Sequence, residues 1–220
     1  MSNTTYAEKL LNGSNIFTLP RTEARIEVYY GVDSQSVSLV SYHGRFDRGE
    51  SWDSRWASPT LDDFLEQVEN EYSTKVPAAL RTQVMDFLSV KDAAFSTRVD
   101  VGEFTSCDSC GDMNGDSITV TYLPEIPGKS DAYLHLKNAN GCFHPFTLNG
   151  AVADVKDEVI DHIATCVRDA ERAAEYAPVS SYTSTSTDYY DYDDRDYDYN
   201  KDSFPGESDV TALLVAVKAL

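Results

Sequence analysis

The sequence predicts an α+β domain, in which antiparallel sheet packs against three to four helices. Strand-like alternation of apolar residues comes first, helical periodicity succeeds it, and strand-like runs return before the longest helix. The composition then changes sharply and becomes acidic. We therefore expect a folded domain at residues 1–178, a disordered acidic linker at residues 179–207 and a C-terminal docking peptide at residues 208–220.

The domain is expected to begin with a helix and a β-hairpin. Thr5 and Glu8 have the spacing of a capping box, and Gly13 ends the short helix that they start. Apolar residues then alternate over residues 24–30 and 36–42, with turn-forming residues between the two runs. This pattern predicts two paired strands.

Residues 43–58 show no such alternation and are expected to form a surface loop. The segment combines three arginines with Trp52 and Trp56, a mixture that is common at contact surfaces. It also contains three acidic residues, so its net charge is near zero. We expect both tryptophans to pack inward.

Three further helices and one strand are expected in the rest of the domain, apart from residues 104–146. Residues 60–72 and 77–90 repeat apolar side chains at helical spacing, and residues 93–104 are expected to form a strand. The longest helix is expected at residues 151–176, where aliphatic residues recur on one face. That face should pack over the preceding sheet.

Residues 104–146 are the stretch around which the rest of the chain is organised. Strand-like runs at residues 118–123 and 132–137 predict a hairpin, which would bring the two ends of the stretch together. Those ends carry residues that could bind a metal, namely Cys107, Cys110, Cys142 and His144. Thiolates and imidazoles are the ligands of structural zinc, which is bound tetrahedrally. We therefore expect a structural zinc ion that stabilises this hairpin.

The C-x-x-C-G motif is the most specific part of this signal. Cys107 and Cys110 offer two thiolates from one tight turn, and Gly111 lets the backbone bend so that its amides face them. Over this motif alone, the chain resembles the first knuckle of zinc-ribbon and treble-clef modules.

The fourth ligand has two candidates. Such modules close with a second pair of cysteines, whereas Ala139 stands at the matching position here. His144 is the first choice, and Cys166, with His162 one helical turn before it, is the second. Two alternatives to zinc are plain reduced thiols and a local redox pair. Turn-forming residues come after Cys110, which disfavours a thioredoxin-type pair because that pair precedes a helix.

The end of the chain combines two contrasting segments. Residues 180–202 contain no aliphatic residue and many aspartates and tyrosines, so they cannot bury enough apolar area to order themselves. Hydrophobic residues return at the end with helical spacing, and they form the expected partner-binding set: Val210, Leu213, Leu214, Val217 and Leu220. A helix this short is marginal alone in water, so it must dock on its own domain, a second copy or another protein.

The overall charge argues against one class of protein, the nucleic-acid-binding proteins. The chain has 37 acidic and 18 basic residues, a net charge of −19, which repels nucleic-acid phosphates and argues against direct nucleic-acid binding. We see neither a signal peptide nor an apolar run long enough to span a membrane. Four cysteines do not make a disulfide scaffold in a chain of 220 residues. We expect a cytoplasmic protein or a component of a virion.

No catalytic motif has specific spacing, so we do not expect an enzyme. The first hypothesis is a zinc-stabilised interaction or assembly protein, which attaches to a protein partner or a virus particle through its C-terminal peptide. The alternative is an acidic inhibitor of a basic DNA- or RNA-binding protein, because the Asp/Tyr alternation of residues 188–199 could mimic phosphates and bases. The aspartate excess could instead reflect a halophilic host.

Overall fold

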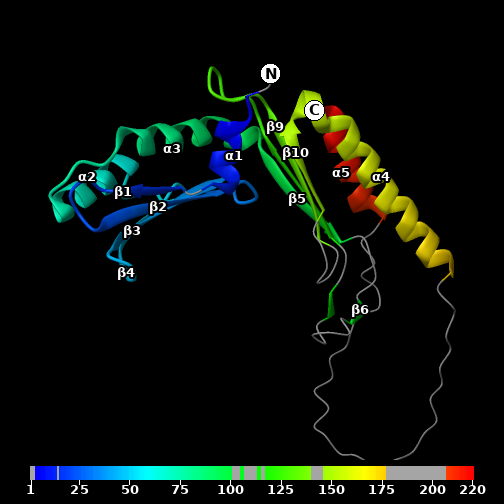
Figure 1. The fold of residues 1–220 in the computed structure, drawn as a ribbon, viewed down its shortest axis with the longest axis horizontal. Coiled ribbons are helices and arrows are strands. Elements are labelled where there is room, and N and C mark those ends of the chain that lie inside the picture. Colours follow the sequence, from blue (N-terminus) through cyan, green and yellow to red (C-terminus); the bar gives the residue numbers. More distant parts are fainter. Residues whose placement is uncertain are drawn as a thin grey trace, which may run out of the picture.

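The structure is a computed structural model that describes residues 3–13, 15–100, 105–106, 113–114, 117–139, 146–176 and 207–220. Within these ranges the chain forms two four-stranded antiparallel sheets, a short two-stranded pair and five α-helices (Figure 1). The α+β class predicted from the sequence is therefore confirmed. Residues 177–206, which include most of the expected acidic linker, lie outside the described part of the chain.

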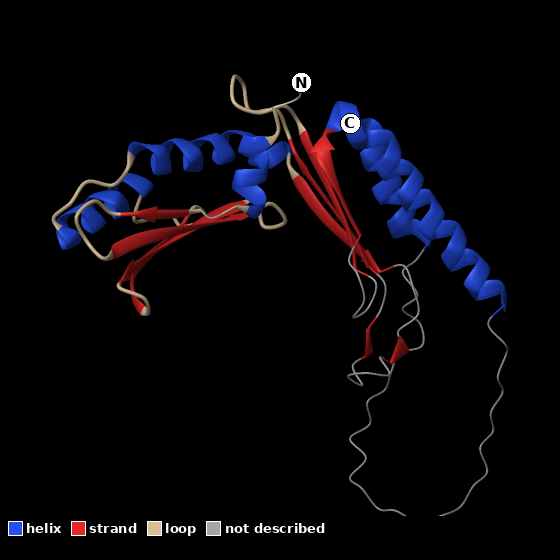
Figure 2. Ribbon diagram, in the orientation of Figure 1, coloured by secondary structure: helices blue, strands red, loops and turns tan. Residues whose placement is uncertain are grey.

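The first sheet and two helices make up the amino-terminal half. The strands pair in sequence order as β1 (Ile16–Thr18), β2 (Ala24–Gly31), β3 (Ser36–His43) and β4 (Asp47–Asp53). Helices α2 (Leu61–Tyr72) and α3 (Ala78–Val90) bury their apolar residues against this sheet. Figure 2 shows the helices on one face of it. The predicted hairpin and both predicted helices are confirmed.

Strand β4 replaces most of the loop that we expected at residues 43–58. Its register pairs Leu39 with Trp52, and the ladder shifts between Val40 and Tyr42. Only the end of β4 is buried, because the strand forms an edge of the sheet, and this explains why the sequence lacks a clear alternation. Trp52 is buried and donates from Nε1 to the Pro59 carbonyl at 3.0 Å, whereas Trp56 is 49% exposed. The inward packing expected for both tryptophans therefore holds for Trp52 alone.

The second sheet has the order β10-β9-β8-β5. Its strands are β5 (Phe95–Asp100), β8 (Ser117–Leu123), β9 (Tyr133–Ala139) and β10 (Phe146–Ala151). Helices α4 (Val152–Tyr176) and α5 (Glu207–Ala219) lie side by side on one face of it (Figure 1). A separate pair consists of β6 (Thr105–Ser106) and β7 (Met113–Asn114). The predicted hairpin of β8 and β9 and the long helix are confirmed.

Strand β10 was not predicted from the sequence, since Asn149 and Gly150 interrupt its apolar residues. Gly150 allows the next helix to turn back tightly onto the sheet. A Cβ atom at this position would lie 2.7 Å from Cγ1 of Val155 in the first turns of α4. The absence of a side chain thus lets α4 pack directly over β10.

Two hydrophobic cores lie under the two sets of helices. The first core is not confined to the first sheet, because it includes Leu123 at the end of β8, Tyr133 at the start of β9 and Ile126 in the connection between them. Helix α1 (Thr5–Asn12) contributes Ala7 and Leu10 to the same core and stands between the two sheets (Figure 1). The two halves are therefore joined by continuous apolar packing.

Polar contacts reinforce this junction. The Tyr6 hydroxyl donates to Asp86 at 2.6 Å, and Lys129 forms an ion pair with the same carboxylate. The Asp131 amide donates to the Asn3 carbonyl at 2.9 Å, and Asn3 returns a hydrogen bond from its own amide to the Asp131 carboxylate at 2.6 Å. Burial and the bond to Asp86 raise the pKa of Tyr6, so its hydroxyl stays protonated as the donor.

Candidate functional site

The second sheet gathers both cysteine-bearing segments at one of its ends. Asp100 at the end of β5 pairs with Ser117 at the start of β8, which pairs with Ala139 at the end of β9. Asn138 in turn pairs with Phe146 at the start of β10. Residues 101–116 and 140–145 are thus both connections that leave the same end of the sheet, as a hairpin of β8 and β9 requires.

The four expected metal ligands, Cys107, Cys110, Cys142 and His144, belong to these two connections and lie outside the described residues. The structure therefore describes the sheet end that carries them and not the ligands themselves. Within the described part of the chain, no group of three or more histidine, cysteine or acidic side chains could hold a metal ion.

Helix α4 brings two further candidate ligands to this end of the sheet. His162 and Cys166 are one helical turn apart, and the His162 Nε2 atom lies 3.7 Å from Cys166 Sγ. Asn138 donates from Nδ2 to His162 Nε2 at 3.2 Å and to Cys166 Sγ at 3.8 Å. Phe146 stacks on the imidazole with 4.6 Å between ring centroids.

The distance between the two α4 side chains suits a shared metal. Zinc binds nitrogen at about 2.0–2.1 Å and sulfur at about 2.3 Å, so two such ligands of one tetrahedral ion lie about 3.6 Å apart. The observed separation of 3.7 Å between His162 and Cys166 is close to this value. Burial lowers the pKa of His162, which favours the neutral imidazole that binds metals.

Asn138 and Phe146 were not singled out from the sequence. Both were placed beside His162 by strand pairing and by the packing of α4 on the sheet, which are contacts between distant parts of the chain. The Asn138 Oδ1 atom is buried and has no hydrogen-bond partner, although the Nδ2 atom of the same amide has two. The amide therefore still has an unused acceptor at this end of the sheet.

The C-terminal segment forms α5 and packs on α4 and β5 of its own chain. Three of the five expected partner-binding residues are buried: Val210, Leu213 and Val217. Leu214 and Leu220 are partly buried against the same core. The helix and the spacing of its apolar stripe agree with the sequence analysis. Of the three docking sites that the sequence allowed, the structure shows the chain's own domain.

Helix α5 packs on a surface made by α4 and β5, and its buried residues share one hydrophobic core with Val99, Val155, Val159 and Ile163. We call this surface the α5 groove. The two helices run antiparallel, because Lys156 near the start of α4 donates from Nζ to the Lys218 carbonyl at the end of α5, at 2.8 Å. This contact satisfies one of the last carbonyls of α5 with a positive charge.

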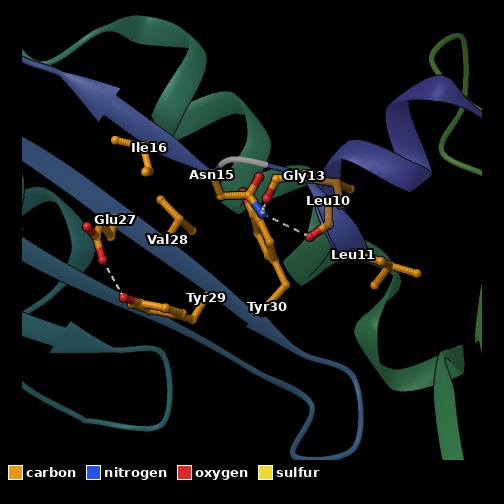
Figure 3. Close-up of a pocket in the computed structure, with 9 residues that line it drawn as sticks. All are labelled: Leu10, Leu11, Gly13, Asn15, Ile16, Glu27, Val28, Tyr29 and Tyr30. Atoms are coloured by element: carbon orange, nitrogen blue, oxygen red, sulfur yellow. Dashed lines mark hydrogen bonds between the residues drawn. The ribbon is translucent and has the colours of Figure 1, made fainter. Parts of the chain in front are cut away.

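A pocket of about 370 Å³ lies between the end of α1 and the first two strands (Figure 3). The residues that line it are Leu10, Leu11, Gly13, Asn15, Ile16, Glu27, Val28, Tyr29 and Tyr30. Asn15 donates from Nδ2 to the carbonyls of Leu10 and Gly13, at 3.2 and 3.4 Å. Its Oδ1 atom is buried without a partner and could accept a hydrogen bond from a small ligand or a water molecule.

Glu27, the carboxylate that lines this pocket, already has hydrogen-bond partners within the chain. Tyr29 donates its hydroxyl to Glu27, and Arg25 pairs with the same carboxylate at 2.9 Å. These bonds lower the pKa of Glu27, with the tyrosine contributing most, and the bond to Glu27 raises the pKa of Tyr29. The described lining therefore offers binding groups, with its carboxylate held as an ion, and it does not pair a nucleophile with a base.

Comparisons of the chain with protein-family models, with curated proteins and with solved structures find no match. Among the described helices, none is both long and apolar enough to cross a membrane.

Proposed function

We propose that this chain is a non-enzymatic interaction protein, in which a zinc-stabilised α+β domain attaches to a protein partner or a larger assembly through α5. One observation carries the proposal. Helices α4 and α5 lie side by side, yet the thirty residues from 177 to 206 separate Tyr176 from Glu207. An antiparallel helix pair needs a connection of only about 2–8 residues. A connection this long gives α5 a reach that its contacts within the chain do not require.

The docking of α5 is of a strength that permits release. Three side chains of α5 are buried, and each buried aliphatic side chain contributes about 1.5–3 kcal/mol. The 13 residues of α5 lose conformational freedom when they dock, which opposes this contribution. Because the helix has so few buried anchors, we infer that α5 can leave the groove while the sheet stays folded. A partner with a matching groove then competes for the released helix.

The length of the tether sets the terms of this competition. The composition of residues 180–202 predicts disorder, and a disordered chain of about thirty residues spans about 30 Å on average. A tether of this length holds α5 near its own groove at an effective concentration of about a millimolar or below. A partner must therefore bind α5 more tightly than the chain's own groove does, or must be present at a high local concentration.

Zinc is the proposed staple at the loop end of the second sheet. Cys107, Cys110 and Cys142 supply three ligands, and the fourth is His144 or Cys166. The position of the two connections at one sheet end supports this assignment, as does the spacing of Cys166 from His162. Zinc binding by Cys166 would require the Asn138 amide to move aside.

Amide hydrogen exchange of the full chain tests whether α5 is releasable. We expect the amides of α5 to exchange through local opening, with a free energy several-fold smaller than that of β8 and β9 in the sheet. The backbone amides of α4 should remain protected from exchange while α5 is open. Equal protection in α5, β8 and β9 would mean that α5 opens only when the whole domain unfolds, and it would exclude a role as a releasable connector.

A further inference from the structure

We propose that the partner which receives α5 is a second copy of this chain, through its own α5 groove. The inference rests on the proposed release of α5 and names the occupant of the groove. The structure places the buried residues of α5 against α4 and β5, in one core with Val99, Val155, Val159 and Ile163. Every copy carries the same groove and the same helix, so a second copy offers a surface that is complementary without any new contact.

Exchange between copies preserves each contact that α5 makes within one chain. Val210, Leu213 and Val217 would meet the same aliphatic side chains, and Lys156 would meet the same Lys218 carbonyl across the new interface. The exchanged and closed forms therefore differ mainly in the entropy of association and of the tether. Neither form exposes the apolar stripe of α5 to water.

The tether is long enough for this exchange. Thirty residues can extend to about 100 Å, which exceeds the diameter of a domain of this size. A connection of a few residues would hold α5 on its own α4, but a length of thirty residues imposes no such limit. Two copies can exchange helices reciprocally into a closed dimer, and several copies can pass α5 along an open chain.

Concentration decides which form is populated. The tethered helix competes at an effective concentration of about a millimolar, so dilute chains stay closed and monomeric. Exchange becomes favoured where the local concentration of the chain is high, or where α5 of a chain cannot dock in the groove of the same chain. The second condition can be created by substitution, which removes the competition from the chain's own groove.

The test mixes two full-length variants with complementary defects. Leu213→Asp places a charge in the buried stripe of α5 and leaves the groove intact, whereas Ile163→Asp places a charge in the groove and leaves α5 intact. Neither chain can close on itself. The intact helix of one variant can dock only in the intact groove of the other.

We expect a 1:1 complex of the two variants by native mass spectrometry, with one chain tagged to separate the masses. Each variant alone should be monomeric. Val215→Asp is the matched control, because Val215 is 62% exposed on α5 and its substitution leaves the helix able to close on its own groove. Mixing this control with Ile163→Asp should give at least about tenfold less complex, since the groove is already filled.

A mixture that stays monomeric, although both variants unfold cooperatively, would overturn the exchange. If Ile163→Asp does not fold, Val155→Asp replaces it, because Val155 belongs to the same core and, at 9% exposed, is the least buried of the three α4 residues named above. The two proposals can fail separately. Local opening of α5 without formation of the 1:1 complex would leave the connector function standing with a different partner.

Discussion

At the scale of single residues, Asp53 shows how one carboxylate fixes the edge of the first sheet. It accepts hydrogen bonds from the Ser38 hydroxyl at 2.7 Å and from the Arg55 side chain at 2.8 and 2.9 Å. The Arg55 amide also donates to it, at 2.9 Å. Because the Asp53 side chain is only 8% exposed, these bonds replace most of its contact with water.

Substitution of Asp53 by asparagine should destabilise the protein at pH 7, and this cost should shrink progressively as the pH falls below 3.8. The hydrogen bonds of Arg55, and then of Ser38, hold the pKa of Asp53 well below its ordinary value of 3.8. A lowered pKa stabilises the folded state above pH 3.8, and this contribution is lost as the pH falls below that value. We expect Asp53→Asn to cost about 1–2 kcal/mol at pH 7, measured by urea unfolding.

The matched control for this prediction is Asp92→Asn. Asp92 also pairs with a neighbouring cation, Lys91 at 2.8 Å, but its side chain is 84% exposed. An exposed pair of this kind contributes little to stability. The control should therefore unfold at the same urea concentration as the parent, both at pH 7 and below pH 3.8. A cost for Asp53→Asn that persisted unchanged in acid would contradict the role given to its charge.

The importance of Asp53 could not be read from the sequence. Its neighbour Arg55 is visible nearby in the chain, but Ser38 reaches it only through the register of β3 and β4. The same limit applies to His162, which the sequence placed on a helix as a secondary candidate ligand. Its contacts with Asn138 and Phe146 depend on which strands α4 covers. Residue types with strong chemistry are visible in a sequence, whereas their partners across the fold are not.

At the scale of elements, α5 should behave as a unit that docks or leaves as a whole. Leu213→Ala removes a buried side chain and should cost about 2 kcal/mol or more of unfolding free energy. Val215→Ala on the exposed face of the same helix should cost less than about 0.5 kcal/mol. Both values are to be measured by urea unfolding of the full chain.

Combining substitutions tests the independence of α5 more sharply. Once α5 no longer docks, a second change in its buried face has nothing further to remove. The double variant Leu213→Ala with Val217→Ala should therefore destabilise by less than the sum of the single variants. Strict additivity would indicate that α5 is an integral part of the domain, which unfolds only with the second sheet.

The helices were predicted from apolar residues at helical spacing. This period is strong in α2 and α4 and weak in α3 and α5, where apolar residues are spread over more of the helix surface. Strands β2, β3, β8 and β9 were found from alternation and turn residues. Three edge strands of the two four-stranded sheets, β1, β4 and β10, were not predicted. Strand β1 has only three residues, and β4 and β10 carry polar residues or glycine where alternation would be expected.

At the scale of the whole molecule, the division of the strands into two sheets was not predicted, and it positions the candidate site. Strand pairing joins residues that are far apart in sequence, so local patterns leave it undetermined. Strand β8 pairs with β5 and β9, and β9 also pairs with β10. Because of this pairing, both cysteine-bearing connections begin and end at the same end of the sheet. The separate core beneath this sheet includes α5, which links the proposed staple and the proposed connector to the same half of the protein.

Removal of zinc should weaken this half of the protein in a way that identifies the ligands. We expect one zinc ion per chain by native mass spectrometry, lost on addition of a strong chelator. A metal that binds only the folded chain, at about 1,000 times its dissociation constant, adds about 4 kcal/mol of stability. For a chain of this length that corresponds to a fall of about 10 °C in the unfolding midpoint when the metal is removed.

Substitution separates the two candidates for the fourth ligand. Cys107→Ser should abolish zinc binding in either case, because it removes a ligand common to both arrangements. Cys166→Ser should weaken zinc binding if α4 closes the site, whereas His144→Ala should weaken it if the β9–β10 connection does. Retention of full zinc binding by Cys107→Ser, or a metal-free chain that unfolds at the same temperature with and without chelator, would remove the staple from the proposal. The release of α5 would then still be decided by hydrogen exchange, because that measurement depends on the groove of α4 and β5 and not on the metal.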